Sequence, residues 1–430
     1  MTKVNIVSMG CSKNLVDSEK LAAQLIANGY TVTFDSEESD AEIAFVNTCG
    51  FINDAKEESI NAILKLAGEK GKSKLKKIVV FGCLSARYYN DLKEELPEVD
   101  FMCGNYNIDE LLAFLGKKPK NAQCHSRILS SAGHYAYLKI SEGCVRNCSF
   151  CAIPLFKGKY VSREMDDIVA EAIHLANKGV KELILIAQDL CFYGYDRENR
   201  FLLPELIDRL SEIDGIEWIR LHYLYPFLFP ERLLEVIRDN PKVCKYIDIP
   251  LQHISNKVLE GMHRGGNKQQ TIELLEKIRT TIPEAVIRTT MLVGFPNESK
   301  VEFEELVDFV KQQKFDRLGV FTYSEEDGTS AASEFSDLIS QEEKEARAER
   351  IMEIQQKISL QANIAKIGKT FRVIIDSVDD NYFVGRTQFD SVEVDNEVIF
   401  PYSSSYKIGD FVNVKIDDAS EYELYGSIID

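Results

Sequence analysis

The hydrophobic and polar positions of the first hundred residues alternate between two patterns. The runs VNIVSM, AEIAFVN and KIVVFG are short, apolar and rich in β-branched residues. Each is followed by a stretch with helical spacing, such as DSEKLAAQLIANG with its closing glycine. This order predicts a parallel β-sheet covered by helices, in an N-terminal α/β domain over residues 1–120.

The pattern lengthens over residues 130–362 but keeps alternating. Six further runs predict strands: AYLKIS, ELILIAQD, WIRLHYLY, YIDIPL, AVIRTTMLVG and RLGVFTYS. Helical stretches such as KQQTIELLEKIRTT separate them, which predicts a partial (β/α) barrel with its active site at the carboxyl ends of the strands. A charged connecting helix follows. The runs TFRVIIDS, YFVGRTQF, NEVIFPY and FVNVKIDD then predict a small all-β barrel over residues 366–430.

Composition narrows the setting of these domains. The chain has 430 residues and a formal net charge of -18, which disfavours a broad nucleic-acid surface without excluding RNA. No apolar run has the length of a membrane span, so we expect a cytoplasmic protein. The ten cysteines cluster instead of pairing evenly, which indicates metal binding or catalysis and not disulfides.

Three cysteines lie close together in GCVRNCSFC, residues 143–151, at Cys144, Cys148 and Cys151. The stretch follows the first predicted barrel strand. A structural zinc site needs four protein ligands. The nearest further candidates lie ten or more residues upstream, at Cys124, His125 and His134. Three thiolates with one open position suit an iron–sulfur cluster better than zinc.

Three other cysteines each follow a predicted strand of the N-terminal sheet: Cys11, Cys49 and Cys83. The carboxyl ends of parallel strands line one crevice, so these residues are expected to meet at one edge of the sheet. They form a second candidate metal site. The alternative is that they are small buried residues of the ordinary kind.

With these features combined, the chain resembles the radical S-adenosylmethionine (SAM) methylthiotransferases along nearly its whole length. That family has a three-cysteine N-terminal domain, a radical SAM barrel with a Cys-x3-Cys-x2-Cys motif, and a C-terminal TRAM barrel. The resemblance implies that Cys144, Cys148 and Cys151 hold a 4Fe–4S cluster that binds SAM and cleaves it to a 5'-deoxyadenosyl radical. It also implies that Cys11, Cys49 and Cys83 hold a second 4Fe–4S cluster, which carries the sulfur. A second SAM would supply the methyl group.

The resemblance also suggests contacts to SAM. Phe150 is similar to the family's aromatic residue beside the adenine, and Gln188 and Arg288 are the best polar candidates. The alternatives are core packing for Phe150 and hydrogen bonds inside the barrel for the other two. Arg146 is expected to be a loop cation without a specific role. The isolated cysteines are expected to be apolar filling and not ligands: Cys103, Cys124, Cys191 and Cys244.

Four stretches favour the RimO-type branch of the family, which modifies an aspartate of small-subunit ribosomal protein twelve: IAQDLCFYGYD, LHYLYP, YSEEDGT and GRTQFDSVEVDNEV. The stretch YSEEDGT, residues 323–329, predicts an acidic loop, and such a loop attracts a basic ribosomal protein and repels RNA phosphates. Residues 366–430 hold 6 Lys and Arg against 13 Asp and Glu, so RNA binding is not expected to dominate. The expected reaction removes a hydrogen atom from the aspartate β-carbon and needs no side chain as general base. An external electron donor and a sulfur donor are expected partners.

Two other functions remain open at this point. One is methylthiolation of tRNA adenosine by the same clusters, and the other is a non-catalytic metal-binding scaffold that docks on the ribosome. The chain also departs from the family pattern at Val145, Cys191 and Asn297. None of these three is a predicted cluster ligand, so they bear on SAM and substrate geometry and not on the type of reaction.

Overall fold

The structure, a computed structural model, describes residues 1–36, 40–120 and 125–429. The chain divides into two units. Unit one holds Met1–Ser131, Tyr137–Val145 and Ala152–Lys178, and unit two holds Ala132–Ala136, Arg146–Cys151 and Gly179–Asp430.

The sheet of unit one has five parallel strands in the order β2-β1-β3-β4-β5. The strands are β1 (Lys3–Ser8), β2 (Thr31–Phe34), β3 (Ile43–Thr48), β4 (Lys77–Gly82) and β5 (Phe101–Met102). The predicted parallel sheet is therefore confirmed. Its three central strands are the three expected from the sequence, and the two edge strands were not expected.

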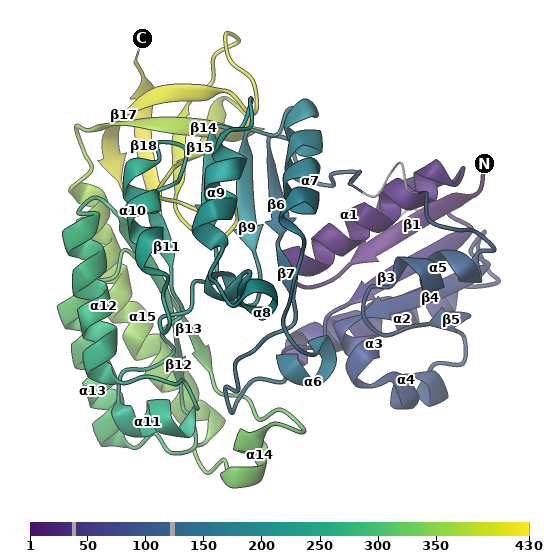
Figure 1. Cartoon of the computed structure of the whole chain (residues 1–430), viewed down its shortest axis with the longest axis horizontal. Helices are drawn as coiled ribbons and strands as arrows, with labels where there is room; N and C mark the ends of the chain where they lie inside the picture. The colour runs from purple at the N-terminus through teal and green to yellow at the C-terminus, as the bar shows by residue number, and fades with distance from the viewer. Residues whose placement is uncertain (37–39, 121–124, 430) are drawn as a thin grey trace. The chain divides into compact units, whose positions relative to one another are not determined.

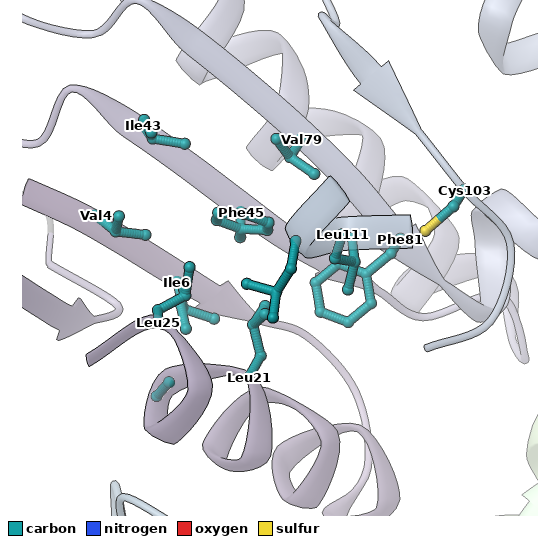
Figure 2. Packing of buried hydrophobic residues seen from close by; sticks show 12 residues of the cluster. Val4, Ile6, Leu21, Leu25, Ile43, Phe45, Val79, Phe81, Cys103 and Leu111 are labelled. Atoms are coloured by element: carbon teal, nitrogen blue, oxygen red, sulfur yellow. The ribbon is translucent and has the colours of Figure 1, made fainter. Parts of the chain in front are cut away.

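Alternate side chains of this sheet enter two apolar cores. Phe45 and Phe81 pack with Leu21 and Leu25 on one face (Figure 2). That face is covered by α1 (Ser12–Ala27) and α5 (Ile108–Phe114). The other face packs on α2 (Asn53–Glu69), α3 (Cys83–Arg87) and α4 (Tyr89–Glu95). Both faces are buried, which explains why the central strands are apolar along most of their length.

Unit one continues with two short antiparallel strands and two helices. These are β7 (Ser141–Glu142), β8 (Val161–Ser162), α6 (Ile153–Lys157) and α7 (Met165–Asn177). Buried ion pairs connect α7 to α1, because the Glu171 carboxylate lies 3.0 Å from Lys20 and 3.1 Å from Arg127. Arg127 also pairs with Glu19.

Unit two contains a partial barrel of parallel strands (Figure 1). Two three-stranded sheets, β10-β9-β6 and β11-β12-β13, are connected by a bridge between Ile219 and Val243. The strands are β6 (Tyr135–Lys139), β9 (Glu182–Ile186), β10 (Trp218–Leu221), β11 (Tyr246–Asp248), β12 (Val286–Val293) and β13 (Arg317–Thr322). All six were predicted from the sequence. Strand β6 includes residues of both units.

Helices connect these strands and continue to the end of the barrel. They are η2 (Leu190–Phe192), α8 (Tyr195–Glu198), α9 (Leu203–Ser211), α10 (Glu231–Asp239), α11 (Asn256–Gly261), α12 (Lys268–Thr281), α13 (Lys300–Gln313), α14 (Ser330–Glu334) and α15 (Gln341–Ile364). Helix α15 is the predicted charged helix, and it packs on β13 and α13.

The C-terminal strands form a closed barrel in the order β14-β15-β16-β18-β17. They are β14 (Thr370–Asp379), β15 (Tyr382–Thr387), β16 (Glu397–Pro401), β17 (Phe411–Ala419) and β18 (Glu423–Ile428). The predicted fold class is therefore confirmed in all three parts, although β18 was not expected. Within the described ranges, no helix has the length and apolarity needed to span a membrane.

Candidate functional site

Three cysteine loops share the carboxyl edge of the sheet in unit one. Cys11 is the N-cap of α1 after β1, Cys49 follows β3 directly, and Cys83 is the first residue of α3 after β4. Strands β1, β3 and β4 are neighbours in the sheet. The expected convergence of the three loops at one edge is therefore found.

Gly10 shows how closely two of these loops approach each other. Its φ of +87° lies in the left-handed region. A Cβ atom at this position would lie 2.7 Å from the Cβ of Cys49 and 2.8 Å from its Sγ. Only glycine allows the loop before Cys11 to pass so close to Cys49.

Asn14 joins the three loops through its side chain. Its Nδ2 donates to the backbone oxygen of Met9 at 3.0 Å and to that of Thr48 at 3.1 Å. The thiol of Cys83 donates to its Oδ1, with Sγ 3.6 Å away. Asn14 is 2% exposed. Asn14 was not among the residues predicted for the site, because it lies three residues before the predicted helical stretch, whereas α1 begins at Ser12.

The three thiols differ in their tendency to ionise. Burial raises the pKa of Cys49, and it raises that of Cys83 to about 12. Cys11 is exposed, but the protein atoms around its thiol still exclude some water, and this desolvation acts to raise its pKa. Lys13 and backbone N–H groups more than offset this effect, so the pKa of Cys11 is lowered. Cys11 is thus the thiol of the three that ionises most readily, while the other two favour the neutral form until a metal binds them.

A buried cation lies near this edge. Phe156 of α6 packs against Cys83, and the next residue, Lys157, pairs with Glu142 at 3.2 Å. The charge of Lys157 acts to lower the pKa of Cys83. Glu142 also pairs with Lys139 at 2.7 Å, and Lys139 in turn contacts Asp17 of α1 at 2.5 Å.

The donor set at this edge suits an iron–sulfur cluster, because thiolates are the usual ligands of such clusters. Nowhere in the described ranges do three Cys, His, Asp or Glu side chains converge closely enough to hold a single metal ion. The thiolates of a cluster bind separate iron atoms, so they do not need to converge on one point.

The second triplet lies on the loop after β7. Cys144, Cys148 and Cys151 are all half-buried. Cys144 belongs to unit one, where its N–H donates to the oxygen of Gly158, and the other two belong to unit two. Phe150 packs against an apolar cluster of unit two that includes Phe295.

Arg146, which was expected to have no specific role, has a structural one in unit two. Its guanidinium pairs with the buried carboxylate of Asp189 at 2.7 Å and lies 3.9 Å from the ring centre of Tyr225. Asp189 directly follows Gln188, and it caps η2 through the N–H of Cys191. The ion pair thus connects the cysteine loop to the carboxyl end of β9.

The two polar candidates for SAM binding lie at different edges of the partial barrel. Gln188 follows the carboxyl end of β9, and its Oε1 is buried without a hydrogen-bond partner among the described residues. Arg288 lies near the amino end of β12, in ion pairs with Asp248 at 2.9 Å and Asp395 at 3.5 Å. A contact between SAM and Arg288 would compete with both ion pairs. Both assignments stay predictions.

The other cysteines that the structure describes are buried. Cys103 lies in the first core of unit one (Figure 2), and Cys244 packs with Trp218 and Tyr246. Cys191, one of the departures from the family pattern, is fully buried, and its thiol donates to the oxygen of Tyr225 with Sγ 3.7 Å away. Cys124 lies outside the described residues.

The other two departures from the family pattern are Asn297 and Val145. The Asn297 amide donates to the backbone oxygen of Lys257 at 3.0 Å, which ties the loop after β12 to α11. Val145 is 41% exposed.

Comparisons with known proteins find matches for three parts of the chain and for the chain as a whole. Family models match residues 3–104 (Uncharacterized protein family UPF0004), 138–310 (Radical SAM superfamily) and 367–429 (TRAM domain). The "Ribosomal protein uS12 methylthiotransferase RimO" of Phocaeicola vulgatus is 52% identical to this chain, over 99% of both chains. The protein of the same name from Flavobacterium johnsoniae is 49% identical, over 99% of this chain and 97% of its own length.

The chain belongs to the RimO family of radical SAM methylthiotransferases. The radical SAM match covers the second cysteine triplet and the partial barrel from the end of β6 to β12, and it ends before β13. The UPF0004 match covers the sheet of unit one with Cys11, Cys49 and Cys83.

Solved structures share the fold at low sequence identity. The radical SAM methyltransferase TsrM from Kitasatospora setae, with cobalamin and a [4Fe-4S] cluster bound, matches with a TM-score of 0.59 and 14% identity, over 78% of this chain and 74% of its own. The cobalamin-dependent radical enzyme OxsB matches with a TM-score of 0.53 and 11% identity, over 82% of this chain and 56% of its own. These matches place the RimO family chain in the radical SAM fold.

Proposed function

We propose that this chain methylthiolates the β-carbon of an aspartate in ribosomal protein uS12, using two 4Fe–4S clusters and SAM. The observation that carries the proposal is the match along the whole chain, at 48–52% identity, to proteins named as uS12 methylthiotransferases. Two cysteine triplets in one chain provide ligands for two clusters, as this reaction requires. When bound, the clusters and SAM would supply a low-potential electron, a carbon radical and the sulfur.

Unit one would hold the cluster that is used for sulfur. Cys11, Cys49 and Cys83 are its proposed ligands, because they share one edge of the sheet. Asn14 fixes the loops that carry them, and Gly10 allows the first loop to approach the second. Lys157 brings positive charge toward Cys83, which favours its thiolate.

The second triplet would hold the cluster that binds and cleaves SAM. Its proposed ligands lie within eight residues of one loop: Cys144, Cys148 and Cys151. Gln188 is the stronger polar candidate for SAM, because its buried Oε1 has no partner within the described part of the chain and follows the carboxyl end of β9. Phe150 would provide an apolar surface beside the adenine.

Exposed acidic groups support a basic protein as the substrate. Glu325 and Asp327 are exposed on the loop after β13, at the carboxyl edge of the partial barrel. The C-terminal barrel adds exposed acids at Asp379, Asp380, Asp417 and Asp418. Such groups attract a Lys- and Arg-rich ribosomal protein and repel the phosphates of tRNA.

The proposed reaction needs partners that supply an electron and a sulfur atom. An external reductant of low potential and a sulfur donor are therefore part of the proposal. We place the reaction in the cytoplasm, because that is where a ribosomal protein meets a modifying enzyme.

Mass spectrometry tests this function directly. The reconstituted full-length enzyme is incubated without oxygen with SAM, a reductant and sulfide, and with uS12 and bulk tRNA in parallel reactions. A mass gain of one methylthio group on an aspartate of uS12 is the expected result. The same gain on tRNA would refute the substrate, and a gain on neither would refute the reaction.

A further inference from the structure

The end of helix α11 holds the loop that carries the second cysteine triplet. The backbone N–H of Ser149 donates to the oxygen of Met262 at 3.0 Å, and its hydroxyl donates to that of Gly261 at 2.6 Å. Ser149 lies between Cys148 and Phe150. All these atoms belong to unit two. The segment that follows α11 is therefore in a position to act on the sulfur of Cys148.

Arg264 in this segment contacts that sulfur. Its Nη1 donates to the Sγ of Cys148 at 3.3 Å, and its Nη2 donates to the backbone oxygen of Pro250 at 2.5 Å. The guanidinium lies 4.6 Å from the ring centre of Tyr225, whose hydroxyl donates to the backbone oxygen of Arg264. Arg264 is 4% exposed, so both its backbone and its side chain are fixed in the interior.

The charge of Arg264 lacks an ordinary partner. Among the residues that the structure describes, no carboxylate forms an ion pair with it, whereas Arg146 on the same Tyr225 ring pairs with Asp189. An unpaired buried cation is costly. The thiolate of Cys148 in a bound cluster would supply the missing negative charge, and Nη1 of Arg264 already lies within hydrogen-bond distance of its Sγ.

We propose that Arg264 is a positioning residue for the cluster at Cys144, Cys148 and Cys151, and that its hydrogen bond to the Cys148 sulfur raises the reduction potential of that cluster. Hydrogen bonds to cluster sulfurs and nearby charge set the potentials of such clusters. A fixed cation stabilises the reduced state, which carries one more negative charge. This inference rests on the proposed function, which places a 4Fe–4S cluster on this triplet.

The test is a reduction titration followed by electron paramagnetic resonance. The full-length chain carries Cys11→Ala, Cys49→Ala and Cys83→Ala, so that only one cluster titrates. In this background, Arg264→Met is expected to lower the ratio of reduced to oxidised cluster about tenfold at a fixed applied potential, which is about 59 mV for one electron. Arg264→Lys keeps the cation and is expected to recover most of the shift.

Two controls separate the possible outcomes. Arg200→Met removes an exposed arginine of the same unit and is expected to leave the potential unchanged. If Arg264→Met loses its iron, Arg264→Gln replaces it in the titration, because it removes the positive charge while keeping a polar side chain, and a lower potential is expected here too. Equal potentials in the parent and in the neutral variant that keeps its iron would overturn this inference and leave the proposed function standing. A parent protein without a 4Fe–4S cluster would instead overturn the cluster assignment on which the proposed function depends.

Discussion

At the scale of single residues, polar side chains inside the helices organise the candidate sites. Asn14, Asp17 and Ser18 are buried on the same stripe of α1 as Leu21 and Leu25. The sequence predicts an apolar stripe on this helix, and polar residues on it are exceptions that need partners. The predicted stretch begins at Asp17, so the pattern could mark Asp17 and Ser18 as unusual but not Asn14. It could not show that the partners of Asn14 lie on loops after three different strands.

Replacing Asn14 therefore has a defined expected effect. Asn14→Ala leaves the backbone oxygens of Met9 and Thr48 without their side-chain donor, and we expect a loss of about 1–3 kcal/mol in the free energy of unfolding. Iron bound by unit one is expected to fall as well. Urea unfolding and iron analysis measure the two effects. Asn61→Ala, at an exposed position of α2, is the matched control, and equal values for the two variants would contradict the assigned role.

At the scale of elements, the sequence predicted the buried strands and missed those at edges and ends. Strand β5 has two residues, β2 alternates between exposed and half-buried positions, and β18 has a single buried residue. Such short or half-exposed runs give a weak hydrophobic signal, and neighbouring strands decide whether they pair. The cysteine loops were predictable because each directly follows a strongly apolar central strand.

The two ends of helix α1 offer a matched pair of glycines. Gly10 and Gly29 share a φ of +87°, but a Cβ atom at Gly29 has no atom within 4 Å, whereas at Gly10 it meets Cys49. Backbone strain costs both alanine variants about 1–2 kcal/mol. We expect Gly10→Ala to lose about 1–3 kcal/mol more than Gly29→Ala in thermal unfolding, because of the added overlap. Equal losses would show that the loops are not held in close contact.

At the scale of the whole molecule, ion pairs between distant segments connect the parts within each unit. In unit two, the stretch that gives the C-terminal barrel its acidic signature is partly internal. Asp390 pairs with Arg317 at 2.5 Å, and Asp395 pairs with Arg288 at 3.5 Å. The sequence shows the charges of this stretch but cannot separate acids with buried partners from exposed ones. The overall acidity of this stretch was predictable. Which of its acids stabilise the fold through ion pairs, and which are exposed to a substrate, was not.

The ion pairs of unit one predict a dependence of stability on pH. Burial acts to raise the pKa of Glu142, but Lys139 and Lys157 outweigh it and lower the pKa to about 2, from an ordinary value of 4.5. The stabilisation is therefore complete above about pH 4.5 and decreases as the pH falls toward 2. We measure thermal unfolding of the parent and of Glu142→Gln at several pH values. Between pH 4.5 and 2 the unfolding temperature is expected to fall less in Glu142→Gln than in the parent. An identical pH profile in both proteins would contradict the role of these ion pairs.

If the two cysteine triplets have separate tasks, one pair of cysteine variants will separate the two activities. Cys83→Ala and Cys148→Ala are each reconstituted and assayed for 5'-deoxyadenosine formation from SAM and for methylthio transfer to uS12. We expect Cys148→Ala to lose both activities, whereas Cys83→Ala still cleaves SAM but transfers no methylthio group. Methylthio transfer by Cys83→Ala, or SAM cleavage by Cys148→Ala, would contradict it.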